Sequence, residues 1–428
     1  MHRTIGRSVA LAGAAALLLA GCSSSSGTEA ASSGEASSGA TGSCEADGIL
    51  KIGNILPQTG NLAFLGPPEF AGVELAVKEI NDAGGVLGND VEVFDGDSGD
   101  TTTNIAVTTA DEHLQRGVDA VIGAASSGVS LTFIDKVTGA GVIHFSPANT
   151  SPAFTTYDDN GLYFRTAPSD LFQGAVLAEV AANDGSTKPA VLALQDAYGE
   201  GLANAFTSNF TNAGGSLALD PVIYDPQAAS FEAEVGKVAA AKPDAVVLIG
   251  FEESKKIVQE LIKQGIGPDK VQLYLVDGNL TNTLGEGLPD GILEGTKGTL
   301  PGAQASDELR AALLEVDPAL VDFSYAAESY DAVTVIALGA AAAGSDCAAD
   351  IAAQLAAVTN DGTACTSYAD CLAKIEAGED IDYNGASGPI ALDENGDPSR
   401  ATMGVYVYGA DNKYTPSDFI EGEVPSAS

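Results

Sequence analysis

The sequence is poor in basic residues. It has 19 Lys and Arg against 59 Asp and Glu, which gives a formal net charge of −40 over 428 residues. Nucleic acids and anionic lipid surfaces are themselves negative, so a chain of this charge is repelled by both. The composition argues against either as a partner, and we expect no nucleic acid to bind. A charge of this size is typical of a protein that stays soluble in a salty or exposed environment.

Histidines and catalytic motifs are also scarce. Of three His, His2 lies in the N-terminal segment, while His113 and His144 fall in a predicted helix and a predicted strand, where a single His is usually structural. There is no GxSxG, GxxxxGK[ST], GxGxxG or HExxH motif. The acidic segments 95–100 and 393–397 lack the Gly and Glu of a calcium loop, and the second is typical of a hairpin turn. We therefore predict no enzyme, no cofactor and no metal site.

Long apolar runs are limited to the N-terminus. The run Val9–Ala20 follows Arg3 and Arg7 and ends in LAGC at Leu19–Cys22. It is too short for a transmembrane helix, and behind basic residues it is typical of an export signal. The small residues before Cys22 resemble the lipobox of bacterial lipoproteins, which implies cleavage before this residue and a lipid on its sulfur. The alternative is an ordinary signal peptide with a Cys there by chance.

Composition divides the rest of the chain. Residues 1–21 are predicted to be the signal peptide and residues 22–47 a lipidated Cys with a flexible tether, because segment 23–43 is almost wholly Ser, Gly, Ala, Thr and Glu. The body that follows has no run of eighteen apolar residues, and its length exceeds what one hydrophobic core usually organises. We expect a soluble two-lobed body on the outer face of the cytoplasmic membrane, or in the periplasm where an outer membrane is present.

Four further cysteines follow the tether. They stand at positions 44, 347, 365 and 371, and an even number in an exported protein favours structural disulfides. Three pairings are open. We favour Cys365–Cys371 as a local link and Cys44–Cys347 as a bond that fastens the start of the body. Metal binding by these cysteines is the weaker alternative, because no CxxC pair occurs.

Strand-like and helix-like segments alternate from Ile49 onward. The pattern predicts helices over 68–82 and 102–116 and from Ser127, and strands in 49–56, 119–123 and 142–147. A second series begins at 190 and repeats two landmarks in order. These are NDAGG (81–85) against TNAGG (211–215), and VDAVIGAASS (118–127) against PDAVVLIGFEES (243–254). Chance reuse of turn residues is the alternative. The alternation predicts an α/β fold of two doubly wound, Rossmann-like lobes.

Polar and aromatic groups follow the predicted strands of both lobes. In such sheets ligands bind beyond the carboxyl ends of the strands. Ser126, Ser127 and the segment SPANTSP (146–152) offer hydroxyl and amide groups to a carboxylate. Opposite them, Asp277 could pair with an ammonium group, and Tyr198 and Phe251 could form aromatic walls. A solvated turn for Asp277 and core positions for the two rings are the alternatives. The sequence predicts a cleft for a small zwitterion.

Several segments together resemble one family. ILPQTGNLAFLG, IGAASSGVS, FSPANTSP, DAYGEGLA, KPDAVVLIG and YAAESYDAV are similar to the substrate-binding lipoproteins of branched-chain amino-acid ABC transporters, the Leu/Ile/Val-binding family of type I periplasmic binding proteins. The similarity runs from about Ile49 to Tyr408. It implies two lobes joined by a three-stranded hinge, which close around an amino-acid-like ligand without chemistry and deliver it to an ABC permease.

The resemblance also implies residue roles. It assigns the ligand carboxylate to Ser127, Asn149 and Thr150, the second lobe's wall to Tyr198 and Phe251, the ammonium group to Asp277, and the neighbourhood of the ligand side chain to Phe64 and Leu65. Two departures stand out. A Glu is common in place of Asp277, and an Ala in place of Asn149. Family members also bind amides, urea and aromatic acids, so the ligand is not fixed.

The same resemblance implies the division into lobes. Lobe 1 is predicted to comprise 48–166 and 299–378, and lobe 2 to comprise 167–298 and 379–428, with hinges near Thr166–Ala167, Gly298 and Gly378. We expect a monomer anchored through Cys22. Two other functions compete with the transport receptor. They are a ligand-sensing domain for a related small molecule such as an amide or urea, and an exported hydrolase with Ser127 as its nucleophile.

Overall fold

The first lobe is built around a parallel five-stranded sheet in the order β2-β1-β3-β4-β5. The structure is a computed structural model and describes residues 44 and 46–425, so the predicted signal peptide and Cys22 lie outside the described residues. The strands are β1 (Lys51–Ile55), β2 (Glu92–Phe94), β3 (Ala120–Gly123), β4 (Ile143–Ser146) and β5 (Tyr163–Arg165). The helices between them are α1 (Gly66–Asp82), α2 (Ile105–Arg116), α3 (Ser127–Ser130), α4 (Ile134–Gly139) and the 3-10 helix η1 (Pro152–Phe154). The helices predicted at 68–82 and 102–116 are confirmed, with shifts of two or three residues at their starts.

Side chains of this sheet alternate between two cores. Ile122 packs in the core that contains the apolar residues of α1, whereas its neighbour Val121 packs in a separate core with residues of α2 and α4. Successive strand residues point to opposite faces, so both faces of the sheet are buried under helices. This explains why every residue of β3 and β4 is buried and why β3 is apolar without interruption.

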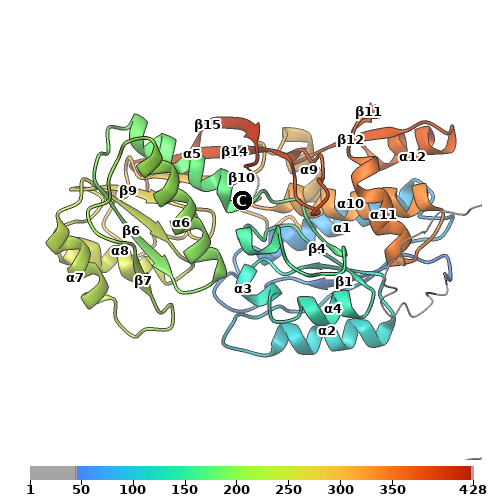
Figure 1. Cartoon of the computed structure of the whole chain (residues 1–428), viewed down its shortest axis with the longest axis horizontal. Helices are drawn as coiled ribbons and strands as arrows, with labels where there is room; N and C mark the ends of the chain where they lie inside the picture. The colour runs from blue at the N-terminus through green and yellow to red at the C-terminus, as the bar shows by residue number, and fades with distance from the viewer. Residues whose placement is uncertain (1–43, 45, 426–428) are drawn as a thin grey trace, which may run out of the picture. The chain divides into compact units, whose positions relative to one another are not determined.

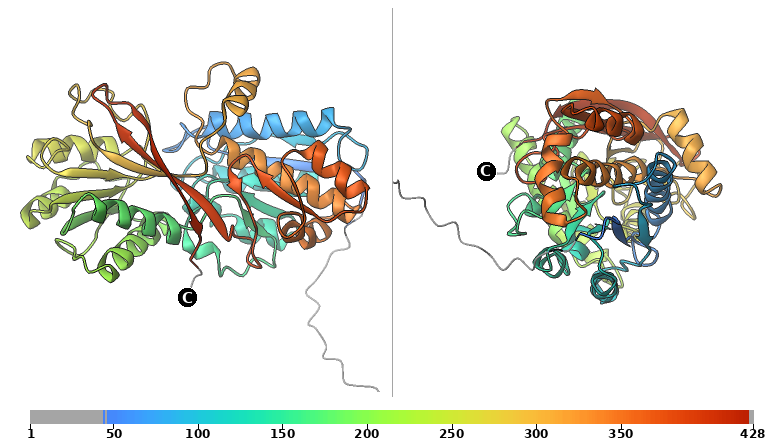
Figure 2. Two further views of the ribbon diagram at one scale, coloured as in Figure 1. Left: turned by 90° about the horizontal axis from the view of Figure 1, so that it is seen from above. Right: turned by 90° about the vertical axis from the view of Figure 1, so that its right-hand side faces the viewer.

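The second lobe contains a seven-stranded sheet in the order β15-β14-β10-β9-β8-β6-β7. Its parallel strands are β6 (Pro189–Leu194), β7 (Val222–Tyr224), β8 (Ala245–Ile249), β9 (Gln272–Leu275) and β10 (Lys297–Pro301). The helices are α5 (Asp170–Asn183), α6 (Ala197–Asn212), α7 (Glu232–Ala241) and α8 (Ser254–Lys263). α5 packs on α6 and α7 on α8, and the two pairs lie on opposite faces of the sheet (Figures 1 and 2). The predicted second βαβ series is present.

Two antiparallel strands complete this sheet. β14 (Arg400–Tyr408) pairs with β10 and with β15 (Tyr414–Glu423), and Figure 2 shows β14 and β15 as a long ribbon. Between β10 and β14 the chain returns to the first lobe. That segment forms α9 (Asp307–Val316), α10 (Ala326–Ala343), α11 (Ala348–Val358), β11 (Thr363–Cys365), α12 (Tyr368–Glu376), β12 (Ile381–Gly385) and β13 (Gly388–Pro389).

One predicted lobe boundary differs from the structure. The first two crossings lie between β5 and α5 and next to β10, beside the predicted positions. The third, predicted near Gly378, lies later. Ile381 and Leu392 belong to the same core as α1 and α10, and the chain joins the second sheet only at Arg400. A short apolar strand can complete either sheet, and its sequence alone does not indicate which one.

The turn at 393–397 has a role that its sequence did not indicate. Its ends are bridged at Leu392 and Pro398, but the flanking strands do not form the predicted hairpin, because β13 pairs with β12 and β14 with β10 and β15. Asp397 instead pairs with the fully buried Arg165 at the end of β5, with Nε–Oδ1 and Nη2–Oδ2 distances of 2.6 and 2.7 Å. The turn is thus fastened to the first crossing by a bidentate ion pair.

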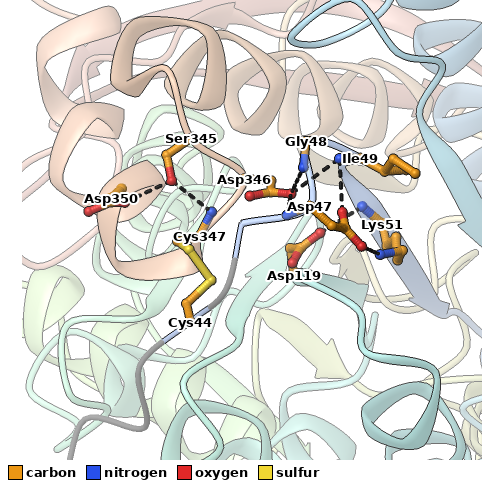
Figure 3. The surroundings of a disulfide bond; sticks show 10 residues. All are labelled: Cys44, Asp47, Gly48, Ile49, Lys51, Asp119, Ser345, Asp346, Cys347 and Asp350. Carbon is orange, nitrogen blue, oxygen red and sulfur yellow. Dashed lines mark hydrogen bonds and ion pairs between the residues drawn. A yellow bond between two sulfur atoms is a disulfide. The ribbon is translucent and has the colours of Figure 1, made fainter.

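Both favoured disulfides are present. Cys44 is bonded to Cys347, and Cys365 to Cys371, so this pairing is confirmed. The start of the body is held a second time beside Cys347 (Figure 3). There, Oδ2 of Asp346 accepts hydrogen bonds from the backbone N–H groups of residues 47, 48 and 49 at 3.0, 2.7 and 3.1 Å.

Removing the Cys44–Cys347 bond with serine at both positions is expected to lower the free energy of unfolding by about 2–4 kcal/mol. This bond joins residues 303 apart in sequence, whereas Cys365 and Cys371 are 6 apart, and a cross-link restricts the unfolded chain more when its loop is longer. Urea denaturation of the two double-serine variants measures both losses. An equal or larger loss for the Cys365–Cys371 variant would contradict this expectation.

Within residues 44 and 46–425, no single helix is both long and apolar enough to cross a membrane. α10 and α11 meet that criterion only together, as a pair bent by 106°. α10 is buried along most of its length and packs against α1 and α11, which explains its apolar sequence by its place in the core of the first lobe.

Candidate functional site

A small closed cavity lies where loops of the two lobes meet. It is lined by residues of the loop before α1, of the segments that follow β3, β4, β8 and β9, of α6, and of the segment directly before α10. The lining residues are Leu62, Leu65, Ala125, Ser126, Ser127, Ala148, Thr150, Tyr198, Phe251, Asp277, Gly278 and Tyr325. All are buried, and the cavity measures about 10 Å³, enough for about one water molecule. A ligand as large as an amino acid can enter only if the lobes move apart.

The first lobe contributes hydroxyl groups. Ser126 is the N-cap of α3, and its Oγ accepts a hydrogen bond from the N–H of Val129 at 3.4 Å. Oγ of Ser127 accepts one from the N–H of Ser151 at 3.3 Å, which leaves its own O–H free to donate. Thr150 lies beside them on the same wall. Two or three hydroxyl donors on one wall suit a carboxylate.

Asn149 and Phe64 lie away from this cavity. The Asn149 amide donates to the carbonyl oxygens of Ala124 and Ala125, both at 2.9 Å, and its Oδ1 accepts from Tyr163. It therefore ties the β4 loop to the β3 loop, and we leave it out of the proposed contacts. Phe64 lines a neighbouring hollow, whereas Leu65 reaches the cavity. The ligand roles of the other predicted residues remain predictions.

Asp277 is the polar centre of the second wall. Its Oδ1 accepts hydrogen bonds from the Tyr198 hydroxyl at 2.7 Å and the Gln173 amide at 2.9 Å, and its Oδ2 accepts one from the Tyr325 hydroxyl at 2.8 Å. Burial raises the pKa of Asp277, and these three donors act against that rise. Every side chain that donates to the carboxylate is neutral, so an ammonium group would supply the missing opposite charge.

Aromatic rings surround this carboxylate. Tyr198 and Phe251 stack with their ring centroids 5.4 Å apart and their planes 7° from parallel. Tyr325 stands directly before α10 with a φ of +60°, a backbone conformation that few non-glycine residues adopt. Sequence reasoning missed Tyr325 and Gln173. The one indication in the sequence was that Tyr325 is the first residue of YAAESYDAV, a segment that carries the family resemblance.

Two further hydrogen bonds lie next to the cavity, one between the lobes and one that holds the first crossing to α10. The hydroxyl of Ser151, after β4, donates to the carbonyl oxygen of Ala197 at the start of α6 at 2.8 Å. The hydroxyl of Thr166, at the first crossing, donates to the carbonyl oxygen of Glu328 in α10 at 2.9 Å. Each bond pairs residues from different parts of the chain, and the first must break when the lobes separate.

Both described histidines are bound to backbone carbonyl groups. Nε2 of His113 lies 2.9 Å from the Asn54 oxygen, and Nε2 of His144 lies 2.6 Å from the Gly123 oxygen. Burial lowers the pKa of His144 to about 3, so this imidazole stays neutral. Neither ring lines the cavity beside Ser127. Across the described part of the chain, no three His, Cys, Asp or Glu side chains stand close enough together to hold a metal ion.

Comparisons with known proteins agree with this architecture. The family described as periplasmic binding protein matches residues 49–413. A protein from Brucella abortus named Leu/Ile/Val-binding protein homolog 1 is 28% identical over 382 residues, which cover 87% of this chain and 94% of that protein.

Two solved structures are similar over most of the chain. The leucine-binding protein LivK of Thermotoga maritima has a TM-score of 0.71 at 25% identity and covers 87% of this chain and 98% of that one. The branched-chain amino acid transporter substrate-binding protein LivJ of Streptococcus pneumoniae, solved in complex with isoleucine, has a TM-score of 0.70 at 21% identity, with 88% and 99% covered.

Proposed function

Because the chain belongs to the periplasmic binding protein family, we propose that it captures a small amino acid, or a similar zwitterion, between its lobes and delivers it to an ABC permease. Proteins of this family bind solutes outside the cytoplasm. The observation that carries the proposal is the position of Asp277, which is held by Tyr198, Tyr325 and Gln173 at a cavity whose opposite wall bears hydroxyl groups. The relatives named for leucine, isoleucine and valine support the class of ligand.

Each wall of the cavity binds one charged group of the ligand. In this proposal, the Ser127 and Thr150 hydroxyl groups of lobe 1 donate to the carboxylate, and Asp277 of lobe 2 accepts from the ammonium group. The rings of Tyr198 and Phe251, with Leu62 and Leu65, surround the side chain. Each hydrogen bond to a charged group contributes roughly 1.5–3 kcal/mol. Because the bonds come from different lobes, a bound ligand favours the closed form.

Closure also explains how the ligand reaches a transporter. Open and closed lobes expose different surfaces, and a permease that binds the closed form selects the loaded receptor. We further propose that the protein is a monomer held at the membrane through a lipid on Cys22, and that it has no enzymatic activity. The lipobox-like sequence LAGC and the Ser- and Gly-rich segment after it support the anchor.

Isothermal titration against the twenty L-amino acids, urea and short amides tests this function. We expect one or a few of the amino acids to bind tightly at the Asp277 cavity and to remain chemically unaltered. Disappearance of a substrate over time would instead indicate an enzyme. If only urea or the amides release or absorb heat on binding, the fold assignment stands, but the proposal of an amino-acid ligand is wrong.

A further inference from the structure

A second pocket lies next to the ligand cavity and is much larger. It measures about 290 Å³, against about 10 Å³ for the cavity at Asp277, and Tyr325 lines both. One side comes from the first lobe through α9, the start of α10 and the loop between them. The other comes from β10, β14 and β15 of the second sheet, which contribute Leu300, Tyr406 and Tyr414. The pocket therefore spans the hinge.

Glu328 reaches into this pocket without a partner. Its residue is only 3% exposed and it lines the pocket. Throughout the described residues, no other residue donates a hydrogen bond to its carboxyl group. Gly302 approaches so closely that a Cβ at this position would lie 2.0 Å from Oε1 of Glu328, which fixes where the carboxyl group sits. Burial raises its pKa to about 8, as expected for an acid with no opposite charge nearby.

Arg310 of α9 supplies a base to the same pocket. Its guanidinium carbon lies 5.0 Å from the centre of the Phe323 ring, and its Nε is buried without a hydrogen-bond partner. Among the described residues, no carboxylate lies within ion-pair distance of it. The nearby Asp322 is already engaged by Ser324 and by the Tyr414 hydroxyl. The pocket is thus lined by two acids, of which Asp322 is hydrogen-bonded and Glu328 is not, and by one base, Arg310, that pairs with neither.

A buried acid without a partner is costly, and so is the buried, unpaired Nε of the half-buried Arg310, unless a ligand satisfies them. The ring of Tyr406 lies within electrostatic reach of both. Burial raises the pKa of Tyr406 to about 12, with Glu328 acting to raise it and Arg310 to lower it. The volume is near the lower end of small-molecule pockets, which begin at about 300 Å³. These features describe a site for a small molecule with charges of both signs.

We propose that this pocket is a second binding site, for a small amino-carboxylate zwitterion whose ammonium group pairs with Glu328 and whose carboxylate pairs with Arg310. Tyr406 and Phe323 flank the ligand between these two charges. Because the walls belong to both lobes, a molecule bound here contacts both sides of the hinge. Its occupancy is therefore linked to closure at Asp277, and by reciprocity each ligand changes the affinity for the other by the same factor.

The absence of tryptophan from the sequence permits a reporter for this pocket alone. Phe323→Trp in the full-length protein places a single Trp beside Arg310. Glycine, L-leucine and L-phenylalanine are the probes, since they share the amino-carboxylate group and differ in side chain. At least one is expected to change the fluorescence saturably. Adding Glu328→Gln or Arg310→Gln should weaken that change at least tenfold, whereas Arg400→Gln, which removes an exposed base outside the pocket, should not.

Asp277→Asn separates the two sites. If the fluorescence change persists in Phe323→Trp/Asp277→Asn and is lost with Glu328→Gln, the second site is supported, even if the proposed transport function fails. If Asp277→Asn removes the change and Glu328→Gln does not, the signal comes from the first cavity and the proposal is wrong. No change with any probe also overturns it. Titration calorimetry of Asp277→Asn, with and without Glu328→Gln, gives the same decision if Phe323→Trp does not fold.

Discussion

Replacing Asp277 by Asn is expected to weaken binding of an amino-acid ligand roughly thirtyfold or more, because truncating one member of a buried charge pair costs about 2–5 kcal/mol at about 1.4 kcal/mol per decade. The residue is 5% exposed, and all three side-chain donors to its carboxylate are neutral. Asn keeps the shape of the side chain and removes the charge that an ammonium group would need. Titration calorimetry with the amino acid that binds the unaltered protein measures the loss.

The matched control is Asp220→Asn. Asp220 is exposed and does not line the cavity, so this variant removes the same charge without touching the site and should bind normally. Equal affinity of Asp277→Asn and the unaltered protein would remove Asp277 from the ammonium site. The fold and the family would stand, but the ligand would have to lie elsewhere or carry no ammonium group.

Replacing Asp397 by Asn is expected to lower the free energy of unfolding by about 3–5 kcal/mol. Arg165 is fully buried, and its guanidinium makes two hydrogen bonds to the Asp397 carboxylate. Without that carboxylate, the buried guanidinium loses its one ion-pair partner among the described residues. Urea denaturation measures the loss. The dependence of the unfolding free energy on urea concentration shows whether the variant and the unaltered protein expose the same surface on unfolding.

An exposed ion pair provides the control for this variant. Arg400 and Glu421 form a similar contact at 2.7 Å, but their side chains are 57% and 54% exposed. Glu421→Gln should therefore cost less than about 1 kcal/mol. A loss for Asp397→Asn no greater than for Glu421→Gln would show that the Arg165 pair does not hold the 393–397 turn to the first crossing.

Much of the fold could be predicted because its signals are local. The alternation of apolar strands with helical segments, and the stops at Gly84–Gly85 and Gly214–Gly215, depend on neighbouring residues alone. In a parallel sheet the carboxyl ends of the strands lie together. This is why Ser127, Thr150, Tyr198 and Asp277, far apart in sequence, line one cavity.

The features that sequence reasoning missed depend on distant pairings. Tyr325, directly before α10, and Gln173, in α5, meet only at Asp277. Arg165 and Asp397 are separated by 232 positions, and neither residue alone indicates an ion pair. The family resemblance assigned Asn149 to the ligand carboxylate, whereas in the structure its amide donates to the backbone of Ala124 and Ala125. Whether one residue of a loop faces the cavity or the backbone behind it depends on a rotation that sequence spacing does not encode.

If the two lobes close around the ligand, the protein becomes more compact on binding, and small-angle X-ray scattering measures this change. The radius of gyration of the full-length protein is measured alone and with each of the twenty L-amino acids at saturating concentration. We expect the radius of gyration to decrease with the amino acid that binds at Asp277, and not to change for Asp277→Asn at the same concentration. An unchanged radius of gyration for a protein that calorimetry shows to be saturated would contradict closure of the lobes around the ligand.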